Sequence, residues 1–321
     1  RNDASAAYFG AISRAYPVQA LLVRVGLCTQ RESWAEYLPQ PLRTAFPAAS
    51  DADGSDVGPL RLSGRVWALS QQAQGCRWVQ WAFQHAATDD ERMALAMELR
   101  GHVLEASRCP HANHVLQRCI ETVDPQALNF VMEEITAASV AQVVKHKYGC
   151  RVVQRLLERC SPCQVRPIVL LILDDIGGFS RHPYGTYVVQ NLLFHGTDED
   201  RGRILQFVAG SFSSLCAVPH GCAAAAAAMA MLSSSERHGC FERLLSEPGL
   251  LRVMALSKPG AALLVRGFGE LFPPERQRVA AAVAEGAQAI AASPHGRSVI
   301  ETLQRLEGSS SGHSGTREAE A

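Results

Sequence analysis

The sequence predicts an all-α protein of the solenoid class, in which similar helical units stack in a row. Three observations support this: a six-residue phrase recurs, its copies begin 36 to 39 residues apart, and apolar residues after each copy recur at helical spacing. Such a period is typical of stacked helical units, because one unit alone cannot bury its apolar face. The copies are GCRWVQ at 75–80, ANHVLQ at 112–117, GCRVVQ at 149–154, GTYVVQ at 185–190, GCAAAA at 221–226, GAALLV at 260–265 and GRSVIE at 296–301.

Each phrase is predicted to begin a helix. Within residues 150–160 the valines and leucines fall on one half of a helical wheel, and Cys150 falls on the other half with the charged and amide side chains. The same division holds for residues 113–121 and 186–194. Further helices fit between the phrases, at 89–100, 125–135, 164–173 and 274–286. Prolines fall at the starts of these elements or between them, where a missing N–H costs least.

The repeats define a domain at residues 59–308. No phrase precedes the copy at 75–80, and residues 50–58 have the composition of a linker. We therefore expect residues 1–58 to be an N-terminal extension and linker, partly disordered. Residues 309–321 are rich in Ser, Gly and acidic residues and are expected to form a disordered tail. Because the chain begins with Arg1, we expect it to be a fragment of a longer protein.

Composition excludes several classes of protein. The 321 residues are 47% hydrophobic, which indicates a folded chain, and 31 basic residues balance 31 acidic ones, so a nucleic-acid site has to be local. The ten cysteines form no disulfide framework, which favours a reducing compartment. We expect no membrane segment. We also expect no metal, no cofactor and no enzymatic activity, because the only C-x-x-C pair is Cys160 with Cys163 and no catalytic motif is present.

The second, third and sixth residues of each phrase are predicted to project together from the polar half of the helix. A glutamine at the sixth position can hydrogen-bond the edge of an unpaired base. The third position holds a flat side chain on which a base can stack. We call the three residues a reading triplet and the helix that carries them a reading helix. The third-position residues are Arg77, His114, Arg151 and Tyr187.

At residues 145–154 and 182–190 the chain resembles the Pumilio (PUF) family of RNA-binding repeat proteins. The resemblance covers about residues 59–308 and is strongest up to residue 196. It implies a right-handed, curved α-solenoid of about seven three-helix repeats, with single-stranded RNA bound antiparallel on the concave face at one base per repeat. It further implies a monomer that regulates the translation or stability of messenger RNA in the cytoplasm through 3′-UTR sites, with effector proteins on the convex face.

The family's pairing rule implies adenine for Cys76 with Gln80, uracil for Asn113 with Gln117, and adenine for Cys150 with Gln154. Together the first three repeats imply a 3′-terminal A-U-A. The pair Thr186 with Gln190 departs from the usual choices, so its base stays open. Glu301 matches the residue that family members use for guanine, although Arg297 and Ser298 do not fit that pattern.

The fifth and sixth repeats have alanine, cysteine or valine at their triplet positions, and we expect them to keep the fold but not the readout. This implies a relaxed element of the form G-N-N-N-A-U-A. Phosphate contacts are expected from Lys145, Lys147 and Arg155, which gather in the third repeat. Two alternatives stay open: a nucleolar factor that binds structured ribosomal RNA with low base specificity, and a solenoid that binds proteins.

Overall fold

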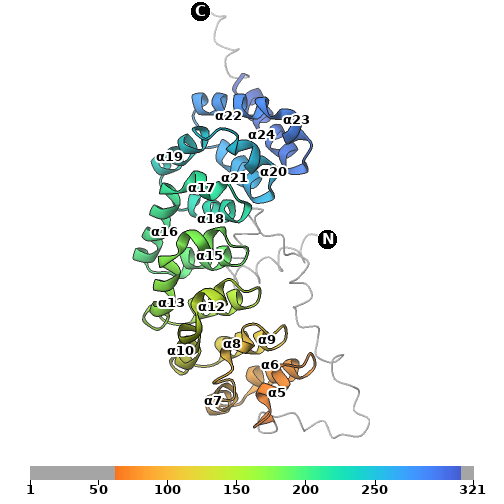
Figure 1. Cartoon of the computed structure of the whole chain (residues 1–321), viewed down its shortest axis with the longest axis vertical. Helices are drawn as coiled ribbons and strands as arrows, with labels where there is room; N and C mark the ends of the chain where they lie inside the picture. The colour runs from red at the N-terminus through yellow and green to blue at the C-terminus, as the bar shows by residue number, and fades with distance from the viewer. Residues whose placement is uncertain (1–61, 312–321) are drawn as a thin grey trace, which may run out of the picture. The chain divides into compact units, whose positions relative to one another are not determined.

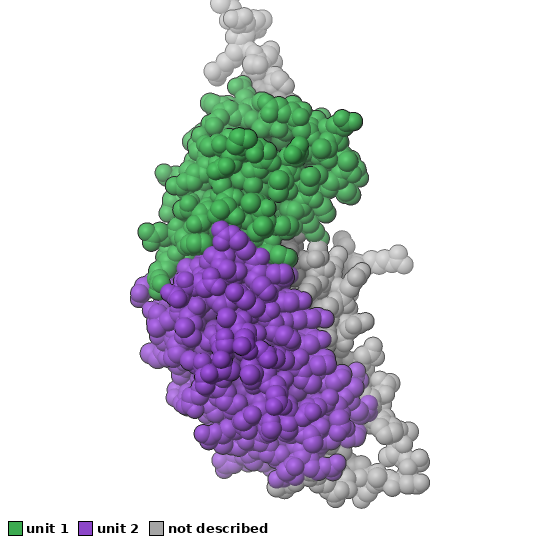
Figure 2. All heavy atoms as spheres, viewed as in Figure 1, with its two compact units in different colours: residues 1–29, 202–321 green, residues 30–201 purple. Residues whose placement is uncertain are grey.

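The computed structural model describes residues 62–311, and this range contains helices and no strand (Figure 1). The described residues form two compact units, unit 2 at residues 62–201 and unit 1 at residues 202–311 (Figure 2). The boundary falls inside helix α16 (Asp198–Gly210). No helix within residues 62–311 is long and apolar enough to cross a membrane. The predicted extension at 1–58 and residues 312–321 of the predicted tail at 309–321 lie outside the described residues, whereas residues 309–311 belong to helix α24.

Unit 2 contains four repeats, each made of a short helix, a reading helix and an outer helix. The bounds of the helices differ from the predicted bounds by a few residues. In repeat two the outer helix begins with the 3₁₀ turn η2, where the Asp124 side chain accepts a hydrogen bond from Gln126 N at 2.7 Å. The helices are α5 (Val66–Ser70), α6 (Gly75–His85), α7 (Asp89–Met97); α8 (Val103–Ala106), α9 (Ala112–Thr122), η2 (Pro125–Leu128) with α10 (Asn129–Ala138); α11 (Val140–Val144), α12 (Gly149–Arg159), α13 (Pro162–Asp174); and α14 (Ile176–Arg181), α15 (Gly185–His195), α16.

Unit 1 continues the same order of helices. It has two three-helix repeats and a last repeat with a short helix and a reading helix within the described range. With the four repeats of unit 2 this makes seven, so the prediction of about seven three-helix repeats in an all-α fold is confirmed. The helices are α17 (Phe212–Cys216), α18 (Pro219–Met229), α19 (Ser234–Leu245); α20 (Leu250–Leu256), α21 (Lys258–Phe268), α22 (Pro273–Glu285); and α23 (Ala287–Ala291), α24 (Pro294–Ser311).

Reading helices pack side by side within each unit. In unit 2, α6 packs against α9, α9 against α12 and α12 against α15; in unit 1, α18 packs against α21 and α21 against α24. The apolar half predicted for residues 150–160 is buried, with Val152, Val153 and Leu156 each at 0% exposure. Gln154 and Arg155 are buried too, which contradicts their assignment to an exposed polar half. The reason is that α12 has a neighbouring reading helix on each side, which leaves only a narrow free face.

The phrase glycine allows a close backbone approach between the short helix and the reading helix. A Cβ on Gly75 would lie 2.5 Å from the carbonyl oxygen of Leu69, and one on Gly185 would lie 2.7 Å from that of Phe179. At these positions the glycine therefore allows the two helices to pack closely. Repeat two has Ala112 at this position. The same approach, to the residue six positions earlier, recurs at Gly149, Gly221, Gly260 and Gly296.

Glutamates in or directly after outer helices cap the start of the short helix of the same repeat. The carboxylate of Glu98 accepts hydrogen bonds from Gly64 N at 2.6 Å and Val66 N at 2.9 Å. The Glu134 carboxylate makes the same pair with Gly101 N and Val103 N, at 2.6 and 3.0 Å. Gly64 and Gly101 both have positive φ, of 76° and 82°. Each glutamate thus satisfies amide groups that a helix start leaves unpaired and joins the end of its repeat to the beginning of the same repeat.

We predict opposite effects for two glycine-to-alanine substitutions. Gly185→Ala should lower the free energy of unfolding by about 1–3 kcal/mol, because the added methyl group overpacks the contact between α14 and α15. Gly202→Ala is the matched control: Gly202 lies exposed inside α16, and a Cβ there meets nothing within 4 Å. It should raise the free energy of unfolding by about 0.5–1 kcal/mol. Urea unfolding of both variants tests this, and equal effects would contradict it.

Candidate nucleic-acid interface

Histidines fix where two of the reading helices begin. The Nδ1 atom of His146 accepts hydrogen bonds from Tyr148 N at 3.2 Å and Gly149 N at 3.5 Å. His182 makes the same pair with Tyr184 N at 3.2 Å and Gly185 N at 3.3 Å. Burial, followed by the charge of Arg108, lowers the pKa of His146, in agreement with a neutral ring that accepts through Nδ1. The recurring H-x-Y-G letters thus have a capping role.

Sixth-position glutamines are oriented by the residue four positions earlier. The Nε2 atom of Gln80 donates to Cys76 O at 3.0 Å, and that of Gln154 donates to Cys150 O at 3.1 Å. In repeats two and four the acceptor is a side chain: Gln117 Nε2 lies 3.0 Å from Asn113 Oδ1, and Gln190 Nε2 lies 3.0 Å from Thr186 Oγ1. A primary amide carries two N–H groups and one oxygen, so each glutamine keeps further hydrogen-bonding capacity for a base edge.

Second-position side chains are buried at the start of each reading helix. The exposed fraction is 5% for Cys76, 0% for Asn113, 3% for Cys150 and 1% for Thr186. Of the glutamines, Gln154 and Gln190 are buried, whereas Gln80 and Gln117 are half-buried. The expectation that all three triplet residues project freely from the polar half is therefore wrong, because packing between neighbouring reading helices covers much of that half.

Third-position side chains are more accessible than the other two. Arg77 is exposed, and His114, Arg151 and Tyr187 are half-buried. Burial lowers the pKa of His114 below 6.5, and the charges of Arg151 and His111 lower it further. Arg151 is the third-position residue of the next repeat, so the charge of one third position lowers the pKa of another. A neutral imidazole beside a planar guanidinium is suited to stacking with bases.

The three residues expected to contact phosphate differ in their surroundings. Lys147 is exposed, with Nζ 5.2 Å from the centre of the Tyr148 ring. Lys145 pairs with Asp175 at 3.3 Å and lies over the Phe179 ring at 4.9 Å. The burial of Arg155 disagrees with the expectation that it contacts phosphate. Its side chain is 6% exposed and forms ion pairs with Glu121 and Glu158, so its charge is already neutralised inside the protein.

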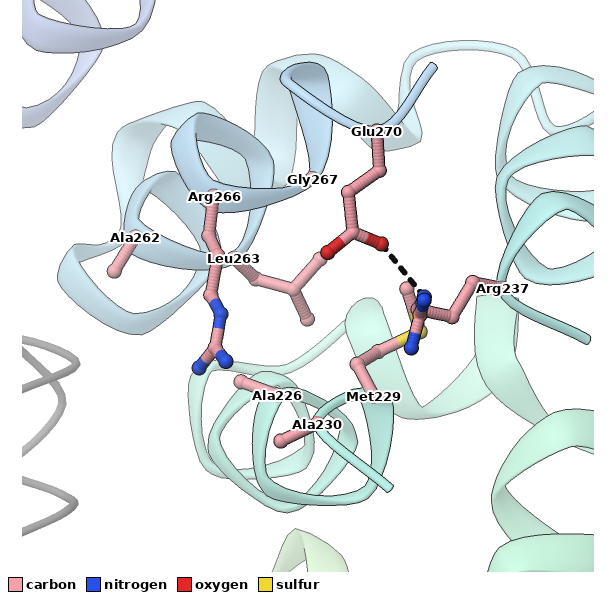
Figure 3. A pocket seen from close by; sticks show the side chains of 9 residues that line it. All are labelled: Ala226, Met229, Ala230, Arg237, Ala262, Leu263, Arg266, Gly267 and Glu270. Carbon is pink, nitrogen blue, oxygen red and sulfur yellow. Dashed lines mark ion pairs between the residues drawn. The ribbon is translucent and has the colours of Figure 1, made fainter. Parts of the chain in front are cut away.

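Unit 1 presents a different surface on its reading helices. Cys222 is fully buried and donates to Cys216 O at 3.2 Å, and Ala226 and Ala261 are buried. Between α18, α19 and α21 lies a cavity of about 120 Å³, lined by alanines, by Arg266 and by the Arg237–Glu270 ion pair of 2.6 Å (Figure 3). No amide side chain lines it. Glu301, Arg297 and Ser298 lie exposed on α24.

The Cys160 and Cys163 pair has no partners for a metal site. Cys160 is buried, which raises the pKa of its thiol to about 11, while Cys163 is exposed at the start of α13. Within residues 62–311 no group of three or more His, Cys, Asp or Glu side chains could hold a metal ion.

Sequence reasoning missed a set of interacting polar residues, half-buried or buried, on the reading helices of unit 2. They are Arg118, Glu121, Glu158 and Asn191, together with the misassigned Arg155. The recurrence of Arg and Glu at the seventh and tenth phrase positions of repeats two and three was the available signal. Their contacts are described in the last subsection of the Results.

The fold and the triplets define a helical-repeat protein whose first four reading helices carry an amide and a flat side chain at matching positions. Residues 65–100, 102–136, 139–173 and 176–208 match the family model of the Pumilio-family RNA binding repeat. Residues 65–208 are therefore made of Pumilio-family repeats, which confirms the resemblance seen in the sequence. The expectation that the chain is not an enzyme agrees with this family.

Curated Pumilio proteins and solved PUF structures are similar to this chain. The Pumilio domain-containing protein C6G9.14 of Schizosaccharomyces pombe is 26% identical over 162 residues, which are 50% of this chain and 23% of that protein. The chain spans about a quarter or less of the first curated relatives it matches. A crystal structure of PUF-8 in complex with PBE-RNA has a TM-score of 0.64 at 22% identity, covering 76% of this chain and 72% of the other. The Puf3 RNA binding domain bound to a Cox17 RNA 3′ UTR recognition sequence gives 0.64 at 22%, covering 77% and 75%.

We predict that acidification destabilises the fold through the half-buried histidines His114 and His195. Burial is the main cause that lowers the pKa of both His114 and His195. As the pH falls below about 6.5, the unfolded chain binds protons that the folded chain does not, so the free energy of unfolding decreases. Denaturant unfolding between pH 7.5 and 5 measures this. His114→Phe keeps a flat ring without titration and should flatten the pH dependence; an unchanged slope would contradict the assignment.

Proposed function

We propose that the chain binds single-stranded messenger RNA in 3′ untranslated regions and that repeats one to three contact a 3′-terminal A-U-A. The observation that carries this is the set of three consecutive triplets in unit 2, each with its glutamine amide held by the residue four positions earlier. Such an amide is partly ordered before RNA arrives, which lowers the entropy cost of edge recognition. Solved relatives bound to PBE-RNA and to a 3′ UTR sequence support the ligand class.

In this proposal the flat third-position residues stack between successive bases, and the pair Thr186 with Gln190 contacts a base of open identity. Glu301 contacts guanine, and repeats five and six accept bases without reading them, which gives the relaxed element G-N-N-N-A-U-A. The small side chains around the cavity in unit 1 support the loss of readout there.

The biological role is part of the same proposal. The chain acts as a monomer in the cytoplasm, where RNA binding regulates translation or messenger stability through an effector protein. Two leucines on the outer helix α13 support a protein partner, because Leu170 and Leu171 are 44% and 47% exposed.

One alternative has an observation in its favour. The alanine-rich triplets of repeats five and six suit a nucleolar factor that binds structured ribosomal RNA with little base readout. Selection of RNA from a random pool separates the two functions. Recovery of A-U-A supports messenger recognition, enrichment without a motif supports the nucleolar alternative, and no enrichment removes both in favour of a protein-binding solenoid.

We predict that a two-residue change recodes repeat two. Asn113→Ser with Gln117→Glu should change the preferred middle base of A-U-A from uracil to guanine, because a carboxylate accepts hydrogen bonds where the amide both donated and accepted. Gln126→Glu is the control, since Gln126 is an exposed residue of η2 and the same amide-to-carboxylate change there should leave the preference at uracil. Binding to RNAs with each middle base measures both variants; a recoded variant that still prefers uracil excludes repeat two from readout.

A second prediction concerns phosphate contact. Each phosphate contact on single-stranded RNA contributes a slope of about 0.7 in a plot of log affinity against log salt concentration. Lys147→Gln should therefore reduce the salt slope by about 0.7, whereas Lys145→Gln should reduce it less, because Lys145 already pairs with Asp175. Filter binding from 50 to 300 mM salt tests this, and equal slopes for Lys147→Gln and the unmodified chain would remove Lys147 from the interface.

A further inference from the structure

A chain of buried polar contacts joins three reading helices of unit 2. On α9, Arg118 Nη1 lies 3.0 Å from Glu121 Oε2, and the other oxygen of Glu121 lies 3.5 Å from Arg155 Nε on α12. Arg155 also pairs with Glu158 on its own helix, and Glu158 Oε1 accepts a hydrogen bond of 2.8 Å from Asn191 Nδ2 on α15. We call these five residues the buried ladder.

The ladder becomes more buried from α9 toward α15. Side-chain exposure is 35% for Arg118 and 26% for Glu121, but 7% for Arg155 and 14% for Glu158, and Asn191 is fully buried. A charge as buried as that of Arg155 strongly destabilises the fold unless partners compensate it, so removing one member is far more disruptive than removing a pair. The alternation of positive and negative groups therefore requires α9, α12 and α15 to keep one mutual alignment.

Every ladder residue lies one helical turn beyond a triplet residue. Residues four apart are neighbours on the same face of a helix, so each ladder residue lies beside the triplet residue before it. A network of charged groups with several partners allows fewer relative positions of two helices than apolar contacts do, because apolar side chains can slide past one another. The pairs are Arg118 after His114, Glu121 after Gln117, Arg155 after Arg151, Glu158 after Gln154 and Asn191 after Tyr187.

We propose that the buried ladder is a positioning device for base selectivity. It fixes the relative axial position of α9, α12 and α15, and thereby the spacing at which the triplets of repeats two, three and four meet successive bases. The inference rests on the proposed function, because it concerns the same triplets. The ladder residues themselves contact no RNA.

Repeat one supplies an internal comparison. Its reading helix α6 carries Trp81 and Gln84 where repeats two and three carry the arginine and the glutamate. The Trp81 ring stacks on His85 of its own helix at 4.4 Å rather than reaching the ladder. Selectivity at the base that repeat one contacts should therefore be independent of the ladder.

The test measures discrimination, the ratio of dissociation constants for a substituted and an intact base, at each position of A-U-A. Arg155→Met with Glu158→Gln removes both charges but keeps an acceptor for Asn191, so its melting temperature should stay close to that of the unmodified chain. Its discrimination should fall about tenfold at the bases of repeats two and three and stay unchanged at repeat one. Arg155→Met alone should lose the same discrimination and also melt at a lower temperature.

Arg166→Met is the matched control. Arg166 on α13 forms an ion pair of 2.5 Å with the buried Asp200 of α16, so it also links two repeats, but between outer helices. The variant should melt at a lower temperature and keep its discrimination at all three bases.

Three results would overturn the inference. Unchanged discrimination in the double variant, or an equal loss at all three bases, would give the ladder a purely structural role. The same loss in Arg166→Met would show that any weakened repeat contact relaxes selectivity. Failure of the unmodified chain to prefer A-U-A at all would defeat the proposed function itself, and with it the positioning role; this outcome is visible before any variant is made.

Discussion

The close approach of each reading helix to the short helix before it is the constraint on which the rest of the fold depends. At six phrase glycines a Cβ atom would collide with a backbone carbonyl oxygen, so the two helices touch through their main chains. This contact sets where the reading helix begins and how it is rotated. The rotation in turn decides that the valines and leucines point into the core and that the triplet side chains lie along the remaining narrow face.

Side-by-side packing of the reading helices removes several of their polar groups from water. Polar groups removed from water need partners, and here most find them within one or two turns of their own helix. The glutamine amides bond the residue four positions earlier, and the arginines pair with glutamates three positions later. A base that meets such a face meets groups whose orientation is already decided.

The two units apply the same scaffold to different surfaces. In unit 2 the reading helices combine amides, flat side chains and a buried charge network, whereas in unit 1 α18 and α21 present alanines around a small cavity with an Arg–Glu pair at its wall. Alanine favours the helix while offering no specific contact. Repeats five and six therefore keep the fold with side chains that include no amide at the triplet positions.

The sequence by itself determined the repeat, the helical class and the family, because periodic glycine, apolar and glutamine positions are local patterns that need no knowledge of neighbours. It also identified the triplet residues, whose roles stay a proposal. Only the tertiary structure decided what is buried. Gln154 and Arg155 are polar residues on the half of the helix that the sequence pattern predicts to be exposed. The local sequence does not show that α9 and α15 cover them. Arg155, expected at phosphate, pairs instead with a glutamate 34 positions earlier, a partner that only stacking of repeats can bring near.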